Sequence, residues 1–186
     1  PDTPGVAKKL TGEGVPSANE IWLPVNRRSE ILLGSPDVIH SFWVPNIAGK
    51  TDLIPGRVNR LVLEPTRTGV FRGICAEFCG TAHAQMLFRV RVVTQEEFDA
   101  KVAAENQPAV VLDHPGRLAF ERNGCGACHS VRGTESRGLV GPDLTHLAAR
   151  ETLGAGILTV TPDNIARFVA LTEHEKPGVE MPSFSM

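Results

Sequence analysis

The most constraining feature of this sequence is the segment Cys75-Ala-Glu-Phe-Cys-Gly-Thr-Ala-His-Ala-Gln-Met86. Within twelve residues it carries two thiols four positions apart, an imidazole at His83 and a thioether at Met86. Thiolate and thioether are soft ligands that select copper over magnesium or calcium, and imidazole suits copper equally well. Ligand sets of this kind usually lie on loops that a rigid scaffold holds in place, so the segment predicts a metal-binding loop.

The number of ligands indicates what kind of copper site the loop builds. One Cys with two His and a weak Met describes a mononuclear blue-copper site, whereas two Cys can bridge two coppers that each need a terminal His. The loop holds only His83, so the second imidazole must come from elsewhere, and His40 is the best candidate. The alternatives are a Cys75–Cys79 disulfide and a structural zinc site, although zinc has little use for Met86.

At these residues the chain resembles the CuA domain of cytochrome c oxidase subunit II. The resemblance covers roughly residues 19–93 and rests on three stretches: Asp37-Val-Ile-His-Ser-Phe-Trp-Val-Pro45, Ile54-Pro-Gly-Arg57 and Cys75-Ala-Glu-Phe-Cys-Gly80 with His83 and Met86. It implies a dinuclear copper centre, whose ligands are His40, Cys75, Cys79, His83, Met86 and the backbone carbonyl of Glu77. It also implies that the Glu77 side chain contributes to a magnesium site facing a partner subunit.

A second cysteine pair lies in Cys125-Gly-Ala-Cys-His129. C-x-x-C-H is the attachment motif of a c-type haem, in which two thiols add to the vinyl groups and the His binds the iron. The rival interpretation, a thioredoxin-like redox pair, requires a βαβ setting that this segment lacks. The motif therefore predicts covalent haem at Cys125 and Cys128, with His129 as an iron ligand.

The segments after this motif resemble the class I cytochrome c domain, over roughly residues 114–184. The resemblance rests on Gly141-Pro-Asp-Leu-Thr145 and Lys176-Pro-Gly-Val-Glu-Met-Pro182. It implies that Met181 is the sixth iron ligand, with Met186 as a second thioether within reach, and that the Pro142 carbonyl binds His129. The usual last helix is expected to be missing, which would leave the face of Leu118 and Phe120 less covered.

The expected fold is two domains, an all-β cupredoxin-like Greek-key barrel followed by an all-α class I cytochrome c domain. The barrel is implied by the resemblance and agrees with several short strands broken by turn residues, predicted at 20–23, 30–33, 38–44, 60–63, 69–74 and 87–93. In the last of these, Phe88, Val90 and Val92 share one face. Thr94 and Glu97 form a capping-box signature for a helix over 94–106, and further helices are expected at 114–123 and 161–171.

The predicted boundaries are an irregular segment at 1–18, the copper domain with its closing helix at 19–106, a linker at 107–113 and the cytochrome domain at 114–186. Residues 1–95 carry 11 basic and 8 acidic side chains, and residues 96–186 carry 8 and 13. Opposite net charges of +3 and −5 fit two domains that contact each other.

No stretch resembles a nucleic-acid-binding patch, and no run approaches the ~18 apolar residues of a membrane helix. Because residue 1 is Pro, we expect a processed chain or a fragment lacking the two membrane helices with which the family begins.

Neither site keeps an open coordination position for a substrate, so no catalytic residue is expected. The resemblance implies the subunit through which electrons enter a haem–copper cytochrome c oxidase. Electrons would come from an upstream donor to the fused haem c, then to CuA, then to the oxygen-reducing membrane subunit I. The expected location is the periplasm or the outer face of the bacterial cytoplasmic membrane. The alternatives are a free-standing CuA and haem c electron carrier, and the CuA portion of a nitrous oxide reductase. The latter tends to have Trp at the position of Glu77.

Overall fold

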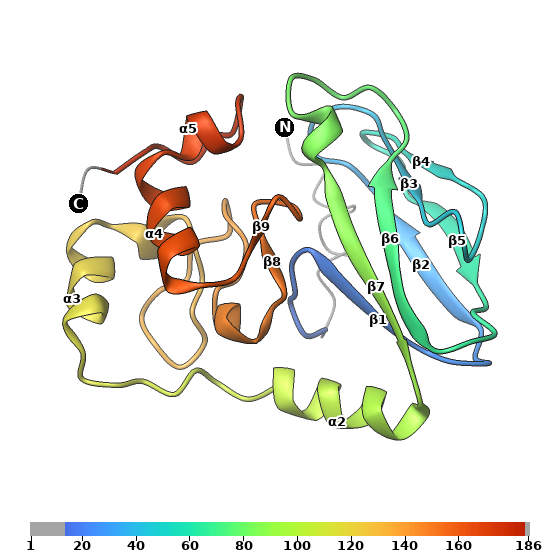
Figure 1. The fold of residues 1–186 in the computed structure, drawn as a ribbon, viewed down its shortest axis with the longest axis horizontal. Coiled ribbons are helices and arrows are strands. Elements are labelled where there is room, and N and C mark those ends of the chain that lie inside the picture. Colours follow the sequence, from blue (N-terminus) through green and yellow to red (C-terminus); the bar gives the residue numbers. More distant parts are fainter. Residues whose placement is uncertain (1–13, 185–186) are drawn as a thin grey trace.

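The computed structural model describes residues 14–184, which form a β-rich half and a second half built of short helices and loops (Figure 1). A single helix and an extended linker pass from one half to the other along one side of the molecule (Figure 1). Among residues 14–184, no helix is both long and apolar enough to cross a membrane. Met186 lies outside the described residues, as does most of the predicted irregular segment.

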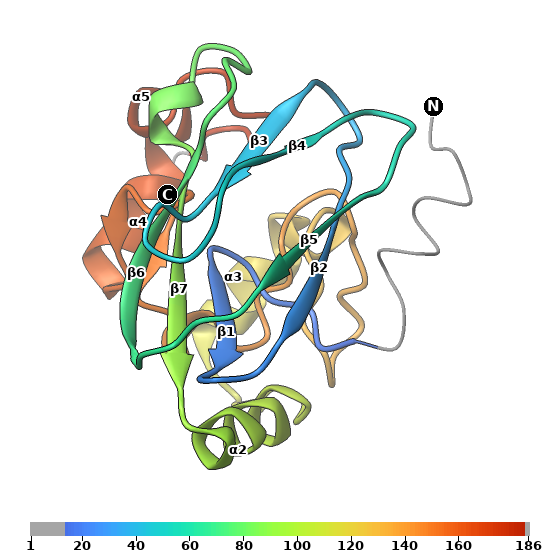
Figure 2. The ribbon, with the colours of Figure 1, turned by 90° about the vertical axis from the view of Figure 1, so that its right-hand side faces the viewer.

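The β-rich half is a sandwich of two sheets (Figure 2). The larger sheet has the order β1-β7-β6-β3-β4, with β1 parallel to β7 and the other neighbours antiparallel. The smaller sheet pairs β2 with β5. The strands are β1 Glu20–Pro24, β2 Ser29–Leu33, β3 His40–Trp43, β4 Thr51–Leu53, β5 Asn59–Leu63, β6 Gly69–Cys75 and β7 Leu87–Val93. This half is therefore a cupredoxin-like β-sandwich, and it agrees with the predicted cupredoxin-like fold, with its strands divided between two sheets.

The core of the sandwich lies between the two sheets. The predicted alternation along β7 is confirmed, since Val90 and Val92 are fully buried and Phe88 stacks on Phe42 with ring centroids 4.8 Å apart. The buried cluster consists of Leu23, Leu33, Phe42, Val44, Leu63, Phe71, Val90 and Val92. Residues on alternate positions of a strand face the same side, so these strands present their apolar faces inward.

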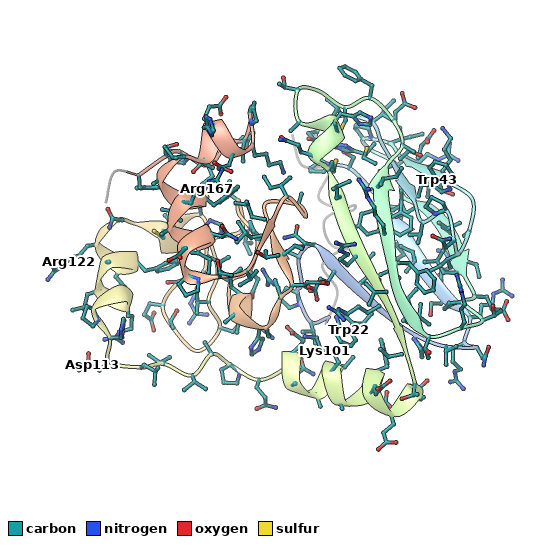
Figure 3. The ribbon with its side chains drawn as sticks, in the orientation of Figure 1. Trp22, Trp43, Lys101, Asp113, Arg122 and Arg167 are labelled. Atoms are coloured by element: carbon teal, nitrogen blue, oxygen red, sulfur yellow. The ribbon has the colours of Figure 1, made fainter. Side chains whose placement is uncertain are left out.

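Helix α2 (Gln95–Glu105) follows β7 directly, and its predicted capping box is confirmed. The Thr94 hydroxyl accepts a hydrogen bond from the Glu97 backbone N–H at 3.2 Å, and the Glu97 carboxylate accepts from the Thr94 N–H at 2.9 Å. The helix has no buried residue, but its Lys101 ammonium lies 5.0 Å from the centre of the Trp22 ring (Figure 3). A cation over an aromatic face is attractive, so this pair fastens α2 to β1.

The second half contains α3 Pro115–Arg122, α4 Pro162–Ala170 and α5 Thr172–Glu175, together with two 3-10 turns, η2 Cys125–Ala127 and η3 Leu147–Ala149. The predicted helices at 114–123 and 161–171 are confirmed within one residue. The expectation of an all-α domain was wrong, because β8 Thr152–Leu153 and β9 Leu158–Thr159 form an antiparallel hairpin. Its turn contains Gly154, Ala155 and Gly156, all with positive φ, which a helix cannot accommodate.

No helix or strand occurs between Glu105 and Pro115, which agrees with the predicted linker. Its Val110 and Leu112 side chains are 86% and 64% exposed. The Ala109 N–H donates to the Arg132 carbonyl at 2.9 Å, so the linker contacts the second half through its backbone. Leu118 is 40% exposed, in agreement with the expectation that its face of α3 is poorly covered.

Candidate copper and haem sites

The predicted copper ligands gather where three neighbouring strands of the large sheet meet one loop. Cys75 is the last residue of β6, His40 is the first residue of β3, and β7 begins directly after Met86. Strands β3 and β6 are paired with Phe42 opposite Cys75, so His40 and Cys75 lie at the same edge. The 3-10 turn η1 (His83–Gln85) brings His83 back over that edge.

The side-chain ligand atoms lie within one small cluster. The Cys75 and Cys79 sulfurs are 3.8 Å apart, and both cysteines are free. His40 Nδ1 lies 3.9 Å from Cys75 Sγ, while His83 Nδ1 and Met86 Sδ lie 3.6 and 3.8 Å from Cys79 Sγ. All five predicted side-chain ligands are thus brought together, with one imidazole beside each thiol.

Glu77 contributes its backbone rather than its side chain to this cluster. Its carbonyl oxygen lies 3.2 Å from Cys75 Sγ, whereas the residue as a whole is exposed. Phe78 beside it is 78% exposed. The loop therefore turns the Glu77 carbonyl towards the sulfurs while it presents a carboxylate and an aromatic ring to the surroundings.

The orientation of His40 is set by Asp37. The Asp37 carboxylate lies 3.0 Å from His40 Nε2 and accepts a hydrogen bond of 2.7 Å from the Ser35 hydroxyl. Burial alone would raise the pKa of Asp37, but the hydrogen bonds with Ser35 and His40 outweigh it and leave that pKa below its usual value. A carboxylate on one ring nitrogen fixes the tautomer and leaves the other nitrogen free to bind metal, here Nδ1 towards the sulfurs.

The two thiols fit a bound cation. Burial, together with the adjacent Cys75, raises the pKa of the Cys79 thiol to about 11. The metal-free pair therefore resists carrying two negative charges, and a metal ion that binds both sulfurs supplies the compensating charge. Two thiols, two imidazoles, a thioether and a carbonyl form a donor set that suits copper and exceeds the four ligands of a structural zinc site.

His129 is buried and lies at one wall of a cavity of about 600 Å³. Its Nδ1 is 2.8 Å from the Pro142 carbonyl, which is the contact expected from the sequence. Any side chain at Gly141 would collide with the His129 ring, so this position admits only glycine. The backbone N–H of His129 donates to the Cys125 carbonyl at 3.0 Å, which places the ring directly after the turn η2.

The cavity brings together residues that are far apart in the sequence. Cys125, His129 and Met181 all line it, while Cys128 is exposed. Apolar side chains form most of its other walls, namely those of Phe120, Val131, Leu144, Leu147, Leu153, Ile165, Phe168, Val169 and Val179. A cavity of this size with an apolar lining and a few polar groups is typical of a cofactor site, and its composition fits a haem.

Two cationic residues of the cavity wall were missed by the sequence analysis. Arg150 is 7% exposed, and its guanidinium donates to the Asp143 carbonyl at 2.5 Å without an ion pair to any carboxylate of residues 14–184. Burial lowers the pKa of both Arg150 and Lys176. A buried cation (Arg150) and a half-buried one (Lys176) at a cavity wall favour an anionic group inside, such as the carboxylates that a haem carries. Arg150 belongs to no recognisable motif, and Lys176 begins the segment 176–182 without a predicted role, so the fold is what places both at the cavity.

Comparison with known proteins agrees with the copper site. Residues 12–93 match the model of the family described as "Cytochrome C oxidase subunit II, periplasmic domain". Cytochrome c oxidase subunit 2 of Alkalihalophilus pseudofirmus is 37% identical over 176 residues, covering 92% of this chain and 51% of that protein. Its namesake from Bacillus sp. PS3 is 33% identical over 182 residues, covering 90% and 51%. The chain thus spans about half the length of these curated relatives.

A solved structure, the periplasmic domain of subunit II of cytochrome oxidase from Bradyrhizobium japonicum, is 36% identical. It covers 53% of this chain and 72% of its own, with a TM-score of 0.46. The family match spans β1 to β7 and includes every predicted copper ligand. Over residues 12–93 the chain is therefore similar to the periplasmic domains of cytochrome c oxidase subunit II.

Proposed function

We propose that this chain forms the part of a haem–copper cytochrome c oxidase through which electrons enter. The observation that carries the proposal is the cluster of two thiols, two imidazoles and a thioether, which the loop after β6 and the start of β3 bring together in the segment that matches the subunit II family. Two copper ions would be held there, with Cys75 and Cys79 both among their ligands. When bound, such a centre carries one electron at a time.

Each remaining ligand has a distinct part in the copper site. His40 and His83 would be terminal ligands, one beside each sulfur, with Asp37 fixing the His40 ring. Met86 and the Glu77 carbonyl would complete the set. With these donors the protein would supply the ligands itself, and the site would exchange electrons without binding a substrate.

The second half would hold a covalent haem c, attached at Cys125 and Cys128 and bound by His129 and Met181. This is supported by the C-x-x-C-H motif, by the His129–Pro142 contact and by the apolar cavity into which Met181 projects. The alignment with the Alkalihalophilus protein spans 176 residues and so extends well beyond the segment that the family model matches. A Met ligand raises the potential of a haem, as in cytochromes c.

The direction of electron flow and the partners belong to the same proposal. Electrons would pass from an upstream donor to the haem, then to the copper pair, then to an oxygen-reducing subunit I, on the periplasmic or outer side of the bacterial cytoplasmic membrane. The exposed Phe78 and Glu77 offer that subunit an aromatic contact and a carboxylate for a magnesium ion. No contact of residues 14–184 favours a free-standing carrier or a nitrous oxide reductase.

Metal analysis and spectroscopy test the copper assignment. We expect two coppers per chain, and in the mixed-valence form an EPR signal from one electron shared by two nuclei. The double change Cys75→Ser and Cys79→Ser should abolish this signal, while Cys125→Ser should leave it intact. A blue-type signal from a single copper would contradict the proposal.

Rapid mixing of the assembled oxidase tests the order of electron flow. In the Cys75→Ser, Cys79→Ser variant we expect a haem that is reduced normally by the donor but is no longer oxidised by the rest of the enzyme. Met181→Leu should instead slow electron arrival while a small artificial donor still reduces the copper. Haem oxidation at the wild-type rate without copper would overturn the order.

A further inference from the structure

The second half of the chain docks directly on the loop that carries the predicted copper ligands. The Leu87 N–H donates to the Ala155 carbonyl at 3.0 Å, and the Gln85 side chain donates to the Glu175 carbonyl at 3.5 Å. Gly178 approaches Thr81 so closely that a Cβ on Gly178 would lie 3.6 Å from the Thr81 Cβ. These contacts fall on residues 81–87, the same stretch that holds His83 and Met86.

The peptide group between Met86 and Leu87 makes two hydrogen bonds, one through its carbonyl and one through its N–H. The Met86 carbonyl accepts from the Cys75 N–H at 3.1 Å, and the N–H of the following Leu87 donates to the Ala155 carbonyl. Both groups belong to the same planar peptide unit, which cannot bend without cost. Because Ala155 lines the haem cavity, this rigid unit connects the cavity wall to the backbone of a copper-ligand cysteine.

The β8–β9 turn has an unusual conformation that allows this contact. Gly154, Ala155 and Gly156 have φ values of 63°, 63° and 89°, and Ala155 is not a residue that adopts positive φ readily. A Cβ on Gly156 would lie 2.9 Å from the Leu87 Cβ, closer than side chains tolerate. Strained backbone of this kind persists where the surrounding structure requires it.

Other contacts between the two halves lie away from the copper loop. The Glu151 N–H donates to the Glu20 carboxylate at 2.6 Å, and Arg91 pairs with Glu151 at 2.9 Å. The Asn19 side chain donates to the Thr152 carbonyl at 3.3 Å. These bonds would keep the halves together if the turn were displaced, so the turn can be tested without separating the domains.

From this arrangement we propose that the turn Gly154-Ala155-Gly156 is a positioning element that holds the haem cavity against the copper loop through the Met86–Leu87 peptide. The inference rests on the proposed function for the identity of the two bound groups. The turn touches no reacting atom itself. It sets the distance between the two sites, and with it the rate at which an electron moves from one site to the other.

The test compares two glycine substitutions in the full chain, loaded with copper and haem. Gly156→Ala inserts a methyl group against Leu87 and should lengthen the hydrogen bond from the Leu87 N–H to the Ala155 carbonyl. Gly133→Ala is a matched control, because Gly133 has a φ of 90° and its Cβ would also lie 2.9 Å from a carbon atom, the Cβ of Pro108 on the linker. Both variants therefore carry the same backbone strain and the same crowding, but only one of them faces the copper loop.

The first measurement is hydrogen exchange of the Leu87 amide, which we expect to become about tenfold faster in Gly156→Ala and to stay unchanged in Gly133→Ala. The second is electron equilibration between the two sites after photoreduction of the haem. It should slow about tenfold in Gly156→Ala only, since a displacement of about 1 Å can cost even more at a reacting centre. Copper and haem absorbance should be unchanged in both variants. Ala155→Gly, which needs no additional space, should give a smaller change in the same direction.

Unchanged Leu87 exchange in both Gly156→Ala and Ala155→Gly would overturn the docking role of the turn. Faster exchange with an unchanged electron rate would overturn its role in setting the distance. A wild-type chain that binds neither copper nor haem would instead refute the proposed function, and the exchange comparison on the same unloaded chains would still decide the docking contact.

Discussion

The two halves of the molecule bury apolar surface in different ways. In the β-sandwich, eight buried side chains pack against one another and form a closed core. In the second half, among residues 107–184, Leu153 is the one apolar residue that is buried. The apolar residues there surround a cavity of about 600 Å³ instead.

This contrast indicates that the sandwich makes its own core, whereas the second half needs an occupant to complete one. A bound group would remove the apolar side chains around the cavity from water, which is favourable. The copper loop, by comparison, lies at the edge of the sandwich, and its metal should contribute little to the core.

The largest effect is expected from removing both predicted haem attachment points. In Cys125→Ser with Cys128→Ser, the second half should lose its cooperative unfolding transition because its cavity has no tethered occupant. Hydrogen exchange should show α4 unprotected while β6 and β7 remain protected. The measurement is exchange resolved by segment, alongside thermal unfolding of the sandwich.

The matched variant for the other site is Cys75→Ser with Cys79→Ser. This variant removes the two predicted thiolate ligands of copper but leaves all eight core side chains in place. The melting temperature of the sandwich should therefore shift by no more than a few degrees. If loss of the copper ligands unfolded the sandwich as completely as loss of the haem cysteines unfolds the second half, the contrast between the halves would be wrong.

The next largest effect is expected from Leu63→Ala, at the centre of the sandwich core. Leu63 is fully buried, and truncating a buried Leu typically costs about 2–5 kcal/mol. Val62→Ala is the control, because Val62 on the same strand is 38% exposed and should cost much less. Denaturant unfolding should register the loss in the sandwich transition. A similar loss in both variants would show that β5 is not packed as described.

The copper site could be predicted more completely than the haem half, and for a physical reason. Cys75, Cys79, His83 and Met86 are close together in the sequence, so their spacing alone brings their side chains near one another. His40 lies 35 positions before Cys75, so its place beside the sulfurs depends on strand pairing, which leaves no periodic signal in the sequence. The sandwich strands were predicted from short runs between turn residues, which did not reveal the three-residue strand β4, and their division into two sheets depends on pairing that such runs do not encode.

In the second half, the motifs predicted the attachment site but not the structure around it. The β8–β9 hairpin is only two residues long on each side, which is too short for alternation to appear. Arg150 and Asp143 are buried charged residues. Charged side chains are usually exposed, so a sequence gives no reason to expect them inside. Such residues become visible only when the fold shows what surrounds them.

A smaller effect is expected from Asp143→Asn in the second half. The buried Asp143 carboxylate accepts from the Ser130 hydroxyl at 3.0 Å and the Thr145 N–H at 2.9 Å, and it lies 3.6 Å from Arg132. Burial alone would raise its pKa, but these hydrogen bonds and the Arg132 charge outweigh burial and lower the pKa from 3.8. Breaking such a set typically costs about 1–3 kcal/mol.

The pH dependence of this variant has a definite sign. A lowered pKa in the folded state means that the stability from Asp143 is complete above the ordinary value of 3.8 and is lost as pH falls through the lower, folded-state value. The difference between wild type and Asp143→Asn should therefore be constant near neutral pH and shrink below about pH 4. Asp113→Asn, on the exposed linker, is the control and should leave the stability at neutral pH almost unchanged.

The smallest effect is expected at Thr94, because α2 belongs to neither core. Its capping box is complete, but the helix buries no residue and is attached to the sandwich mainly through Lys101 over Trp22. Thr94→Ala should therefore cost about 1 kcal/mol of local helix stability, the usual value for a lost N-cap. Faster hydrogen exchange in the first turn of α2 should report this, with the sandwich transition almost unchanged.

Gln95→Ala is the control, because it keeps the cap and should leave the hydrogen exchange of that turn unchanged. If Thr94→Ala instead lowered the sandwich transition as much as Leu63→Ala, α2 would have to be counted as part of the core, and the boundary between the two halves would lie after it.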